Sequence, residues 1–335
     1  MKVLVVGGAG YIGSHTVYEL IRAKHDVVVL DNLSTGRRNS VHPLARFYSG
    51  DIRNRKDIAN ALAIETTDTP IDVVMHFAAK LIVPESINHP LEYYQNNVDG
   101  LRTLLDTLVQ FGVSRIVFSS TAAVYGQPEN GICHEDDSTT PINPYGETKL
   151  AAEKMIHWVA QAHNMQYCIF RYFNVAGADA SLEIGLDKDQ LTHLIPLIMQ
   201  TALGLRDKFY IFGDDYNTPD GTCIRDYIHV TDLAKAHILG AEYLVNTGSS
   251  LTANLGSGRG YSVKEVLDTT LELFALPYEY GDRRPGDPDQ LTADISRAQK
   301  VLGWRPELDL HAILKSDYSF RKKLLAGQQM VGCIS

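Results

Sequence analysis

The sequence predicts an α/β fold, with a doubly wound parallel sheet in its first half and a smaller mixed α/β domain after it. Short β-branched runs alternate there with amphipathic segments, the pattern of parallel strands joined by crossover helices. Most of these runs are apolar nearly throughout, as strands buried on both faces should be. The alternation stops after about Arg171, where Gly, Pro and Asp become frequent. A chain of 335 residues that is 44% hydrophobic can supply cores for two such domains.

The first half carries the predicted sheet. Its strand candidates are Lys2–Val6, Asp26–Leu30, Arg46–Ser49, Ile71–Phe77, Arg115–Ser119 and Gln166–Arg171. The helix candidates between them are Tyr11–Ala23, Lys56–Ile64, Pro90–Phe111 and Tyr145–His163. Pro144 ahead of one helix and Gly112 after another are typical start and stop residues. We therefore predict a sheet domain over residues 1–170.

The second half is more irregular. Gly, Pro and Asp gather in the tracts 213–221 and 283–288. Two helical patterns interrupt it, Thr231–Leu244 and Ser262–Phe274, and each begins with a residue suited to cap a helix. We predict that residues 171–335 form the smaller domain over the carboxyl edge of the sheet, and that a segment at about 224–255 returns to the first domain.

Charge and composition exclude several classes of protein. There are 40 acidic and 31 basic residues, a net charge of −9, which argues against nucleic acid as a partner. Only four apolar residues, Val3–Val6, precede the first glycines, and no run approaches the ~20 that span a membrane. Without a paired CxxC arrangement, the cysteines are expected to be reduced thiols of a cytoplasmic protein and to bind no metal. They are Cys133, Cys168, Cys223 and Cys333.

A glycine loop follows the first strand directly. Gly7, Gly10 and Gly13 stand at GxxGxxG spacing between a strand and a helix. Glycines there allow a tight turn and bring the backbone close to a pyrophosphate, which the N–H groups of the helix start then bind. The loop therefore predicts a dinucleotide site of the Rossmann type.

Two carboxylates sharpen this prediction. Asp31 ends the second strand, 18 residues after Gly13, where a carboxylate accepts both ribose hydroxyls of NAD and repels the additional phosphate of NADP. Asp51 and Ile52 follow the third strand, where the adenine is expected. NAD is therefore the predicted cofactor.

A tyrosine and a lysine near the start of one helix form a candidate catalytic pair. Tyr145 and Lys149 stand at i and i+4, so both side chains lie on one helix face. An ammonium group and a positively charged nicotinamide ring would both favour the phenolate of a tyrosine whose ordinary pKa is ~10. A hydroxyl from the preceding strand should complete the group, and Ser119, Ser120 and Thr121 are all candidates.

With these motifs in place, the chain resembles the extended short-chain dehydrogenases/reductases, and among them the nucleotide-sugar epimerases. The matching segments are spread over nearly the whole length. They are 7–15, 30–33, 50–53, 76–79, 92–98, 118–126, 144–149, 171–174, 225–230 and 283–287.

The resemblance implies a role for residues at each part of the site. Tyr145 would be the base, Lys149 its electrostatic partner and a ligand of the cofactor ribose, and Thr121 the hydroxyl that steers the substrate O4. NAD would be held by Gly7, Gly10, Tyr11, Ile12, Gly13, Asp31, Asn32, Leu33, Ser34, Thr35, Gly36, Asp51, Ile52, Phe77, Ala78, Ala79, Lys80, Leu81, Asn96, Thr121, Tyr145, Lys149 and Phe173. A UDP-sugar would be held by Thr121, Tyr145, Asn174, His193, Leu194, Tyr210, Phe212, Arg225, Arg284, Asp287 and Leu291.

The sequence departs from the family pattern at three places. A lysine that is frequent in the cofactor loop corresponds to Leu81, with Lys80 one residue earlier. His193 stands where an asparagine often binds the diphosphate region. Leu291 occupies the position that limits room beside the sugar C2 group, and a leucine is neither a bulky aromatic nor a very small residue.

The activity that the resemblance implies is the NAD-dependent interconversion of UDP-glucose and UDP-galactose at C4, through a transient 4-keto sugar. Epimerisation of UDP-N-acetylhexosamines or UDP-pentoses stays open, because the same machinery would serve. Dehydration is disfavoured because Ala122 and Ala123 replace the acidic residues it needs, and a non-catalytic NAD-sensing protein is disfavoured because Tyr145 and Lys149 are both present. The resemblance also implies a homodimer formed through Pro90–Phe111 and the helix of Tyr145, with no membrane partner.

Overall fold

The computed structural model describes residues 1–66, 69–128, 130–188, 191–284 and 287–332, and its centre is a seven-stranded sheet. The strands are β1 (Lys2–Val6), β2 (Asp26–Asp31), β3 (Arg46–Ser49), β4 (Val73–His76), β5 (Arg115–Thr121), β7 (Gln166–Tyr172) and β11 (Leu251–Leu255). Their order across the sheet is β11-β7-β5-β4-β1-β2-β3, and every neighbouring pair is parallel. The predicted doubly wound sheet is confirmed.

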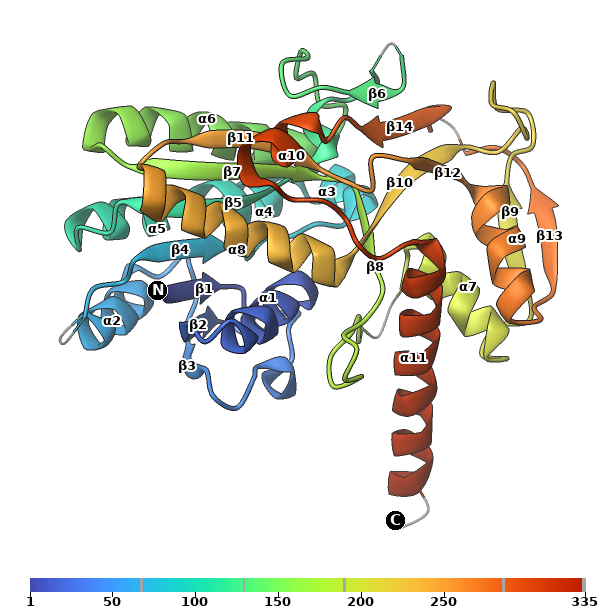
Figure 1. The fold of residues 1–335 in the computed structure, drawn as a ribbon, viewed down its shortest axis with the longest axis horizontal. Helices are drawn as coiled ribbons and strands as arrows, with labels where there is room; N and C mark the ends of the chain where they lie inside the picture. The colour runs from blue at the N-terminus through green and yellow to red at the C-terminus, as the bar shows by residue number, and fades with distance from the viewer. Residues whose placement is uncertain (67–68, 129, 189–190, 285–286, 333–335) are drawn as a thin grey trace.

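Helices cover both faces of this sheet (Figure 1). Side chains alternate along β1: Val3 and Val5 pack with α1 (Tyr11–Arg22) and α8 (Val230–Thr247) on one face. Leu4 and Val6 pack on the other face with α2 (Arg55–Glu65), α5 (Gly100–Gln110) and α6 (Pro144–His163). Both faces are therefore apolar, which explains why the strand sequences are apolar nearly throughout.

The six predicted strands all form, and β11 is a strand that the sequence pattern did not reveal. Its run is only five residues long, follows a Gly/Ser-containing turn, and includes the polar Thr252 and Asn254. β11 pairs along its whole length with β7. The chain thus enters the main sheet once more after the irregular tracts of its second half.

Two helix predictions need correction. Pro90–Phe111 is not one α-helix: α4 (Pro90–Tyr93) is followed by the π-helical segment η2 (Tyr94–Asp99) and then by α5. The π-helical segment is only six residues long, too short for its wider turn to be distinguished from an α-helix by hydrophobic periodicity. Thr231 does not cap α8, because the cap is His229, whose ring accepts a hydrogen bond from the Thr231 N–H. The predicted cap Ser262 is confirmed by a capping box.

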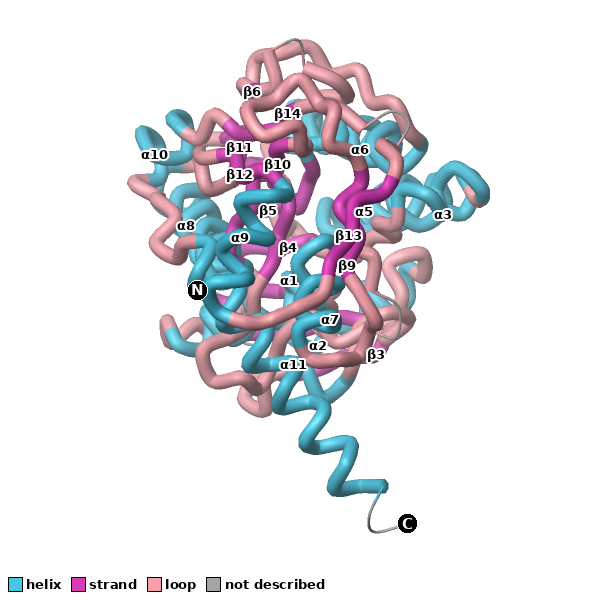
Figure 2. The backbone as a smooth tube through the Cα atoms, turned by 90° about the vertical axis from the view of Figure 1, so that its right-hand side faces the viewer, coloured by secondary structure: helices cyan, strands magenta, loops and turns pink. Residues whose placement is uncertain are grey.

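The remaining elements lie mainly beyond the carboxyl edge of the main sheet. Smaller sheets join β6 (Ile132–Cys133), β8 (Asn174–Ala176), β10 (Ile224–His229), β12 (Gly260–Ser262) and β14 (Gln290–Ala293), and separately β9 (Phe209–Phe212) with β13 (Tyr278–Gly281). The helices are α3 (Val83–Asn88), α7 (Leu194–Ala202), α9 (Val263–Leu273), α10 (Ser296–Leu302) and α11 (Leu310–Gly332), with short turns η1 (Arg38–Ser40) and η3 (Ala122–Val124). β9 and β13 lie side by side in Figure 2, where the end of α11 projects from the body.

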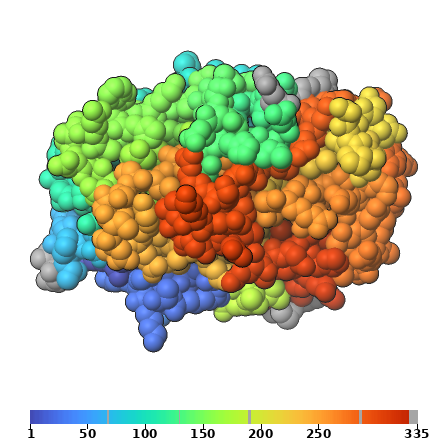
Figure 3. All heavy atoms as spheres, turned by 45° about the horizontal axis from the view of Figure 1, so that its top comes forward, coloured from blue at the N-terminus to red at the C-terminus, as the bar shows by residue number. Residues whose placement is uncertain are grey.

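Segments far apart in the sequence meet on the surface of this second part. In Figure 3, the green region around β6 borders the orange-red C-terminal segments, in accord with the pairing of β6 and β14. A separate apolar core joins α7, α9, α11 and β9. In the described part of the chain, no helix is long and apolar enough to cross a membrane, and no cluster of side chains suited to a metal ion is found.

Candidate active site

The predicted NAD and catalytic residues gather where the strands of the main sheet end. Gly7 follows β1, Asp31 ends β2, Asp51 follows β3, Phe77 follows β4 and Thr121 ends β5. The carboxyl ends of parallel strands meet at one edge of a sheet, which is where α/β proteins bind ligands. The fold therefore brings together the cofactor and catalytic candidates that lie far apart in the sequence.

The glycine loop is packed too tightly for side chains. Gly7 has a φ of +84°, and a Cβ there would lie 2.5 Å from the Ala78 nitrogen. A Cβ on Gly13 would lie 2.2 Å from the Gly7 oxygen, and one on Gly36 would lie 2.6 Å from the carbonyl carbon of Ala9. Tyr11 and Ile12 begin α1 at the end of this loop. The loop thus presents bare backbone at a helix start, the arrangement that binds a pyrophosphate.

Asp31 is buried and holds the loop from the next strand. Its Oδ2 accepts a hydrogen bond from the Ala9 N–H at 2.9 Å, and its Oδ1 accepts one from the Leu33 N–H at 2.8 Å. A carboxylate has about four acceptor sites, so each oxygen retains capacity for a ribose hydroxyl. Leu33 has a φ of +58°, and the exposed residues Ser34 and Thr35 continue the turn toward Gly36.

Asp51 is bound by neighbouring side chains rather than left open. Arg53 donates two hydrogen bonds to its carboxylate, and Asn32 Nδ2 donates one to Oδ2 at 2.9 Å. The Arg53 guanidinium is the largest cause that holds the pKa of Asp51 well below its ordinary value. Ile52 is buried directly after it. The carboxylate therefore fixes the Asn32 loop and keeps its charge at any physiological pH.

The loop after β4, which contains Phe77, Ala78, Ala79, Lys80 and Leu81, is held by a residue that the sequence did not single out. The buried amide of Asn97 accepts a hydrogen bond from the Lys80 N–H at 2.9 Å and donates to the Lys80 carbonyl at 3.0 Å. It also donates to Thr148 Oγ1 on α6 at 3.1 Å. Asn96, the predicted NAD ligand, donates to Asn97 in turn.

Lys80 and Leu81, where the cofactor loop departs from the family pattern, both lie on the surface side of this loop. The Lys80 ammonium pairs with Glu85 at 2.9 Å and with Glu92 at 2.6 Å. The Leu81 side chain is 40% exposed. The Lys80 ammonium is thus paired with two carboxylates in this structure.

The three hydroxyls at the end of β5 have different partners. Ser119 Oγ bonds to the Tyr172 hydroxyl, and Ser120 Oγ donates to Glu153 at 2.5 Å. The Thr121 side chain lies close enough to the Tyr145 hydroxyl to lower the pKa of that phenol, and Thr121 Oγ1 accepts a hydrogen bond from the Ala123 N–H at 3.2 Å. Of the three candidates, the structure therefore places only Thr121 against Tyr145.

Tyr145 and Lys149 lie on one face of α6, but the lysine is not aimed at the phenol. Lys149 Nζ donates to the Ser119 carbonyl at 2.8 Å and lies 4.9 Å from the centre of the Phe118 ring. Burial raises the pKa of Tyr145 to about 12, against the hydrogen bond from Thr121, and burial lowers the pKa of Lys149 to about 8, against the charge of Glu153. The side chains alone do not make Tyr145 a base at neutral pH, so a bound positive charge is needed.

Several predicted UDP-sugar residues meet around β10 and β14. Arg225 and Leu291 are partners in the parallel register of these strands. Arg225 donates to the carbonyls of Ile224 and Pro288 and lies 3.9 Å from an oxygen of Asp287. Leu291 packs with half-buried Phe173 against the apolar cluster that includes Ala122 and Leu150. Asn174 begins β8 and donates to the Asp226 carbonyl at 3.2 Å.

The remaining candidates lie on β9, α7 and the loop after β13. Tyr210 and Phe212 project from the exposed face of β9, and the Arg284 guanidinium lies 4.1 Å from the centre of the Phe212 ring. His193 precedes α7, which begins at Leu194, and its ring bonds to Thr192. Burial and the nearby charge of Lys188 lower the pKa of His193. A neutral imidazole there is available as a donor to an anion.

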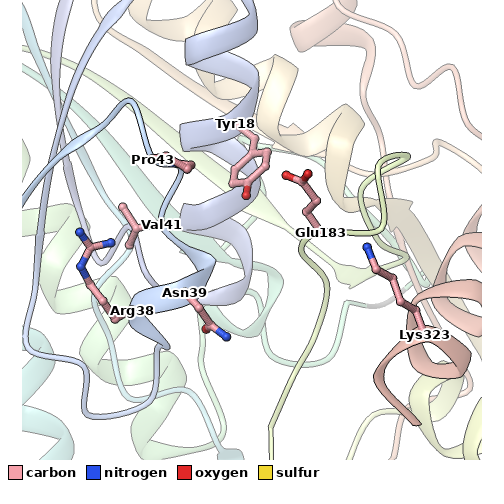
Figure 4. A pocket seen from close by; sticks show the side chains of 7 residues that line it. All are labelled: Tyr18, Arg38, Asn39, Val41, Pro43, Glu183 and Lys323. Atoms are coloured by element: carbon pink, nitrogen blue, oxygen red, sulfur yellow. The ribbon is translucent and has the colours of Figure 1, made fainter. Parts of the chain in front are cut away.

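A hollow of about 910 Å³ lies elsewhere on the molecule, between α1, the η1 region and α11 (Figure 4). Tyr18 and Glu183 face each other in it, and Lys323 points toward Glu183 from the wall formed by α11. Its lining consists of Tyr18, Arg38, Asn39, Val41, Pro43, Glu183 and Lys323. None of the predicted site residues contributes to it.

Comparison with known proteins is consistent with this geometry. The model of the NAD dependent epimerase/dehydratase family matches residues 3–256. The chain belongs to this family. The predicted family and its dependence on NAD are confirmed.

Similar proteins cover almost the whole chain. A UDP-glucose 4-epimerase of Halalkalibacterium halodurans is 49% identical over 96% of this chain and 96% of its own length. The crystal structure of UDP-glucose 4-epimerase from Brucella ovis in complex with NAD superposes with a TM-score of 0.91 at 43% identity, covering 95% of this chain and 97% of that one. The UDP-Glc/GlcNAc 4-epimerase of Campylobacter jejuni has a TM-score of 0.84 at 39% identity, with 96% and 99% covered.

Proposed function

We propose that this chain interconverts UDP-glucose and UDP-galactose by inverting the configuration at C4. The observation that carries the proposal is the placement of Thr121 beside the Tyr145 phenol, with Lys149 one helical turn away, at the sheet edge where the glycine loop begins. A hydroxyl and a phenol side by side can bind the 4-hydroxyl of a sugar, and the phenolate can take its proton. The arginines around β10 and the loop after β13 supply the cations that a diphosphate needs on an acidic chain.

The residues present fit NAD. The glycine loop leaves no space for side chains where a pyrophosphate approaches, and Asp31 retains acceptor capacity for the ribose. In the proposal the loop holds the pyrophosphate, Asp31 the adenosine ribose, Asp51 and Ile52 border the adenine, and Lys149 binds the second ribose. When bound, NAD supplies a positive ring that favours the phenolate of Tyr145 and a carbon that accepts the C4 hydride and returns it.

Inversion requires that the sugar be free to turn while the nucleotide stays fixed. Arg225, Arg284 and Asn174 would hold the UDP part, and the apolar cluster around Leu291 would border the sugar. Thr121 and Tyr145 would then reach O4 of the 4-keto sugar before and after the sugar turns over. Residues 1–170 would thus hold NAD and residues 171–335 the UDP-sugar.

A second substrate class is kept because of Leu291. Leucine is of intermediate size, and Ala122 and Phe173, which belong to the same apolar cluster, are not charged, so these three side chains do not by themselves select between a C2 hydroxyl and an N-acetyl group. UDP-N-acetylhexosamines or UDP-pentoses are therefore the alternative substrates. The UDP-Glc/GlcNAc enzyme of Campylobacter jejuni is a relative of that kind.

The test is the product mixture formed from each candidate substrate. The purified, undialysed protein is incubated with UDP-galactose, UDP-N-acetylgalactosamine and UDP-arabinose, and the isomers are separated and quantified. We expect UDP-glucose from UDP-galactose as the fastest reaction. Turnover of only the N-acetyl or pentose substrate would select the alternative, and no turnover of any of them with NAD bound would indicate a non-catalytic NAD-binding protein.

Tyr145→Phe is the decisive variant. Loss of the phenolic proton carrier should lower kcat by about 10² to 10⁴ while NAD stays bound. Tyr243→Phe, on α8 and outside every predicted site, is the matched control and should keep the parental rate. A Tyr145→Phe protein with parental kcat would refute the mechanism.

We further propose a homodimer formed through the segment Pro90–Phe111, which contains α4 and α5, and through α6. α4 and α5, which lie in the predicted dimer segment 90–111, both contact α6, and large apolar side chains are exposed there: Leu91 on α4 is 82% exposed and Trp158 on α6 70%. Exposed apolar patches of this kind are typical of an interface. Light scattering should give twice the chain mass for the parent and one chain mass for Leu91→Asp/Trp158→Glu. Leu44→Asp, equally exposed at 73% but remote in sequence, is the control that should leave the mass unchanged.

The compartment proposed for this activity is the cytoplasm. Cys133, Cys168 and Cys223 are buried free thiols, as expected where the environment keeps cysteines reduced. Cys333 lies outside the described residues. Alkylation of the denatured protein, purified from its source without reductant, should label these thiols in full.

A further inference from the structure

A buried acidic and basic pair lies next to the proposed catalytic lysine. Glu153 stands one turn after Lys149 on α6 and Arg171 lies on β7, and their side chains are 2% and 8% exposed. Arg171 binds both carboxylate oxygens, with its NH2 nitrogen 2.7 Å from Oε2 and its Nε 3.0 Å from Oε1. Ser120 donates a further hydrogen bond to Oε1. Neither Glu153 nor Arg171 is among the site residues predicted from the sequence.

Arg171 is itself fixed by its remaining donor atoms. Its NH1 nitrogen donates to the Tyr125 hydroxyl at 3.1 Å and to the Glu135 carbonyl at 3.2 Å. The Tyr125 hydroxyl in turn donates to Asn254 at 2.6 Å. The guanidinium is therefore anchored on the side away from Glu153, and it cannot follow the carboxylate if that group turns toward Lys149.

Lys149 is left in an unusual state. Its side chain is buried and donates to the carbonyl of Ser119, and it forms no ion pair among the residues that the structure describes. Glu153 at i+4 is close enough to oppose the effect of burial on its charge. Burial of an ammonium without a carboxylate in contact favours the neutral amine, and a carboxylate nearby favours the ammonium.

We propose that Glu153 and Arg171 are positioning residues of the reaction: Arg171 holds Glu153 near Lys149, so that the carboxylate keeps the lysine positively charged without drawing its ammonium out of the cleft. This proposal rests on the proposed function, which makes the charged lysine a ligand of the cofactor ribose and a partner of Tyr145. A carboxylate free to rotate would pair with Lys149 directly, and an absent one would let the lysine lose its proton. The two hydrogen bonds from the Arg171 guanidinium prevent direct pairing of Glu153 with Lys149, and the charge of Glu153 prevents the lysine from losing its proton.

The other titratable groups around Lys149 do not supply this effect. Burial, together with the charge of Lys149, lowers the pKa of His76 on β4 to about 3, so the imidazole is neutral at working pH. Tyr172 on β7 is likewise held neutral, because burial raises its pKa. Glu153 and His76 interact electrostatically with Lys149, and Tyr145 lies on the same face of α6. Arg171 and Tyr172 on β7 bond to Glu153 and to Ser119, respectively. Glu153 is the single anion among these titratable residues.

The test follows the charge of Lys149 in the holoenzyme. Protein labelled with ε-¹³C lysine is titrated by NMR, with the Lys149 resonance assigned through Lys149→Arg, and kcat/KM is measured over the same pH range. Without its neighbouring carboxylate, Lys149 in Glu153→Gln should lose its proton at least about one pH unit lower than in the parent. The alkaline limb of kcat/KM should move to lower pH by the same amount.

Two further variants keep the test decisive. Glu147→Gln removes an exposed carboxylate from the first turn of the same helix, and it should leave both curves in place. If Glu153→Gln does not fold, Glu153→Leu/Arg171→Leu replaces the whole buried pair by apolar groups, an exchange that buried pairs often tolerate. It should shift the curves in the same direction but by less, since the opposing charge of Arg171 is also removed.

The outcomes separate this proposal from the proposed function. Unchanged titration of Lys149 and an unchanged alkaline limb in both variants would overturn it, even if kcat falls, because a purely structural role lowers the rate without moving the limb. If the parent has no epimerase activity, the proposed function fails, but the NMR titration still decides whether Glu153 sets the charge of Lys149.

Discussion

Asn97→Leu should loosen the loop that borders the predicted NAD site, because one buried amide holds it. Asn97 is 3% exposed and its side chain makes four hydrogen bonds: two to the Lys80 backbone, one to Thr148 on α6 and one from Asn96. Leucine has a similar volume and can make none of them. A buried polar group left without a partner costs about 1–3 kcal/mol, and Lys80 would have two such groups. Allowing for new apolar contacts of the leucine, we expect a loss of about 2–4 kcal/mol in the free energy of unfolding.

Chemical denaturation measures this loss directly. With a urea slope of about 3 kcal/mol/M, the expected loss lowers the midpoint by about 1 M. NAD should also dissociate at least tenfold faster during dialysis, because Asn97 connects the loop after β4 to the helix of Lys149. Gln95→Leu, exposed in the same π-helical segment, is the control and should behave as the parent. A midpoint for Asn97→Leu within about 0.2 M of the parent would refute the reasoning.

Three further predictions concern stability, catalysis and specificity. Burial alone would raise the pKa of Asp179, but bonds to Arg22 and Ser181 lower it to about 2. The stabilisation of the folded state by Asp179 is therefore complete above pH ~4 and is lost as the pH falls through ~2. Because Arg22 is partly exposed, Asp179→Asn should lower the free energy of unfolding by only about 1–2 kcal/mol at pH 7. In urea titrations this difference should disappear below pH ~2. Thr121→Val should lower kcat by about 10² with KM little changed, whereas Thr121→Ser should stay within about tenfold of the parent; equal rates for Val and Ser would exclude a role for the hydroxyl. Leu291→Ala should raise kcat/KM for UDP-N-acetylgalactosamine relative to UDP-galactose, and an unchanged ratio would show that Leu291 does not border the sugar C2 group.

The parts of the site that follow from local spacing could be predicted from the sequence. The glycine loop, Asp31 at the end of β2 and the Tyr145–Lys149 pair each depend on a strand or helix whose pattern is visible within about 20 residues. The sheet followed in the same way, because strands buried on both faces are apolar throughout. Strand position left three neighbouring hydroxyls as candidates and the family resemblance selected Thr121; the structure adds that each of the three has a different partner.

The parts that depend on contacts between distant elements could not be predicted. Asn97 bonds to Thr148, which is 51 residues away, and Glu153 bonds to Arg171, which is 18 residues away on another element. The π-helical segment that contains the buried Asn97 is only six residues long, too short to be recognised from hydrophobic spacing. Buried polar groups of this kind have no periodic signature, because what defines them is the partner that satisfies them.

The three hydroxyls of β5 depend both on local spacing along the strand and on contacts with distant elements. Side chains alternate along a strand, so Ser119 and Thr121 share one face and Ser120 lies on the other. On the first face Thr121 lies beside Tyr145 and Ser119 bonds to Tyr172, while on the second face Ser120 bonds to the Glu153 carboxylate. The Ser119 carbonyl, in the plane of the sheet, receives the Lys149 ammonium. One short strand end thus fixes the phenol, the lysine and the anion near the lysine, and a shift of β5 by one residue would exchange these partners. The register of β5 between β4 and β7 is therefore as much a determinant of the proposed chemistry as the identity of Tyr145 itself.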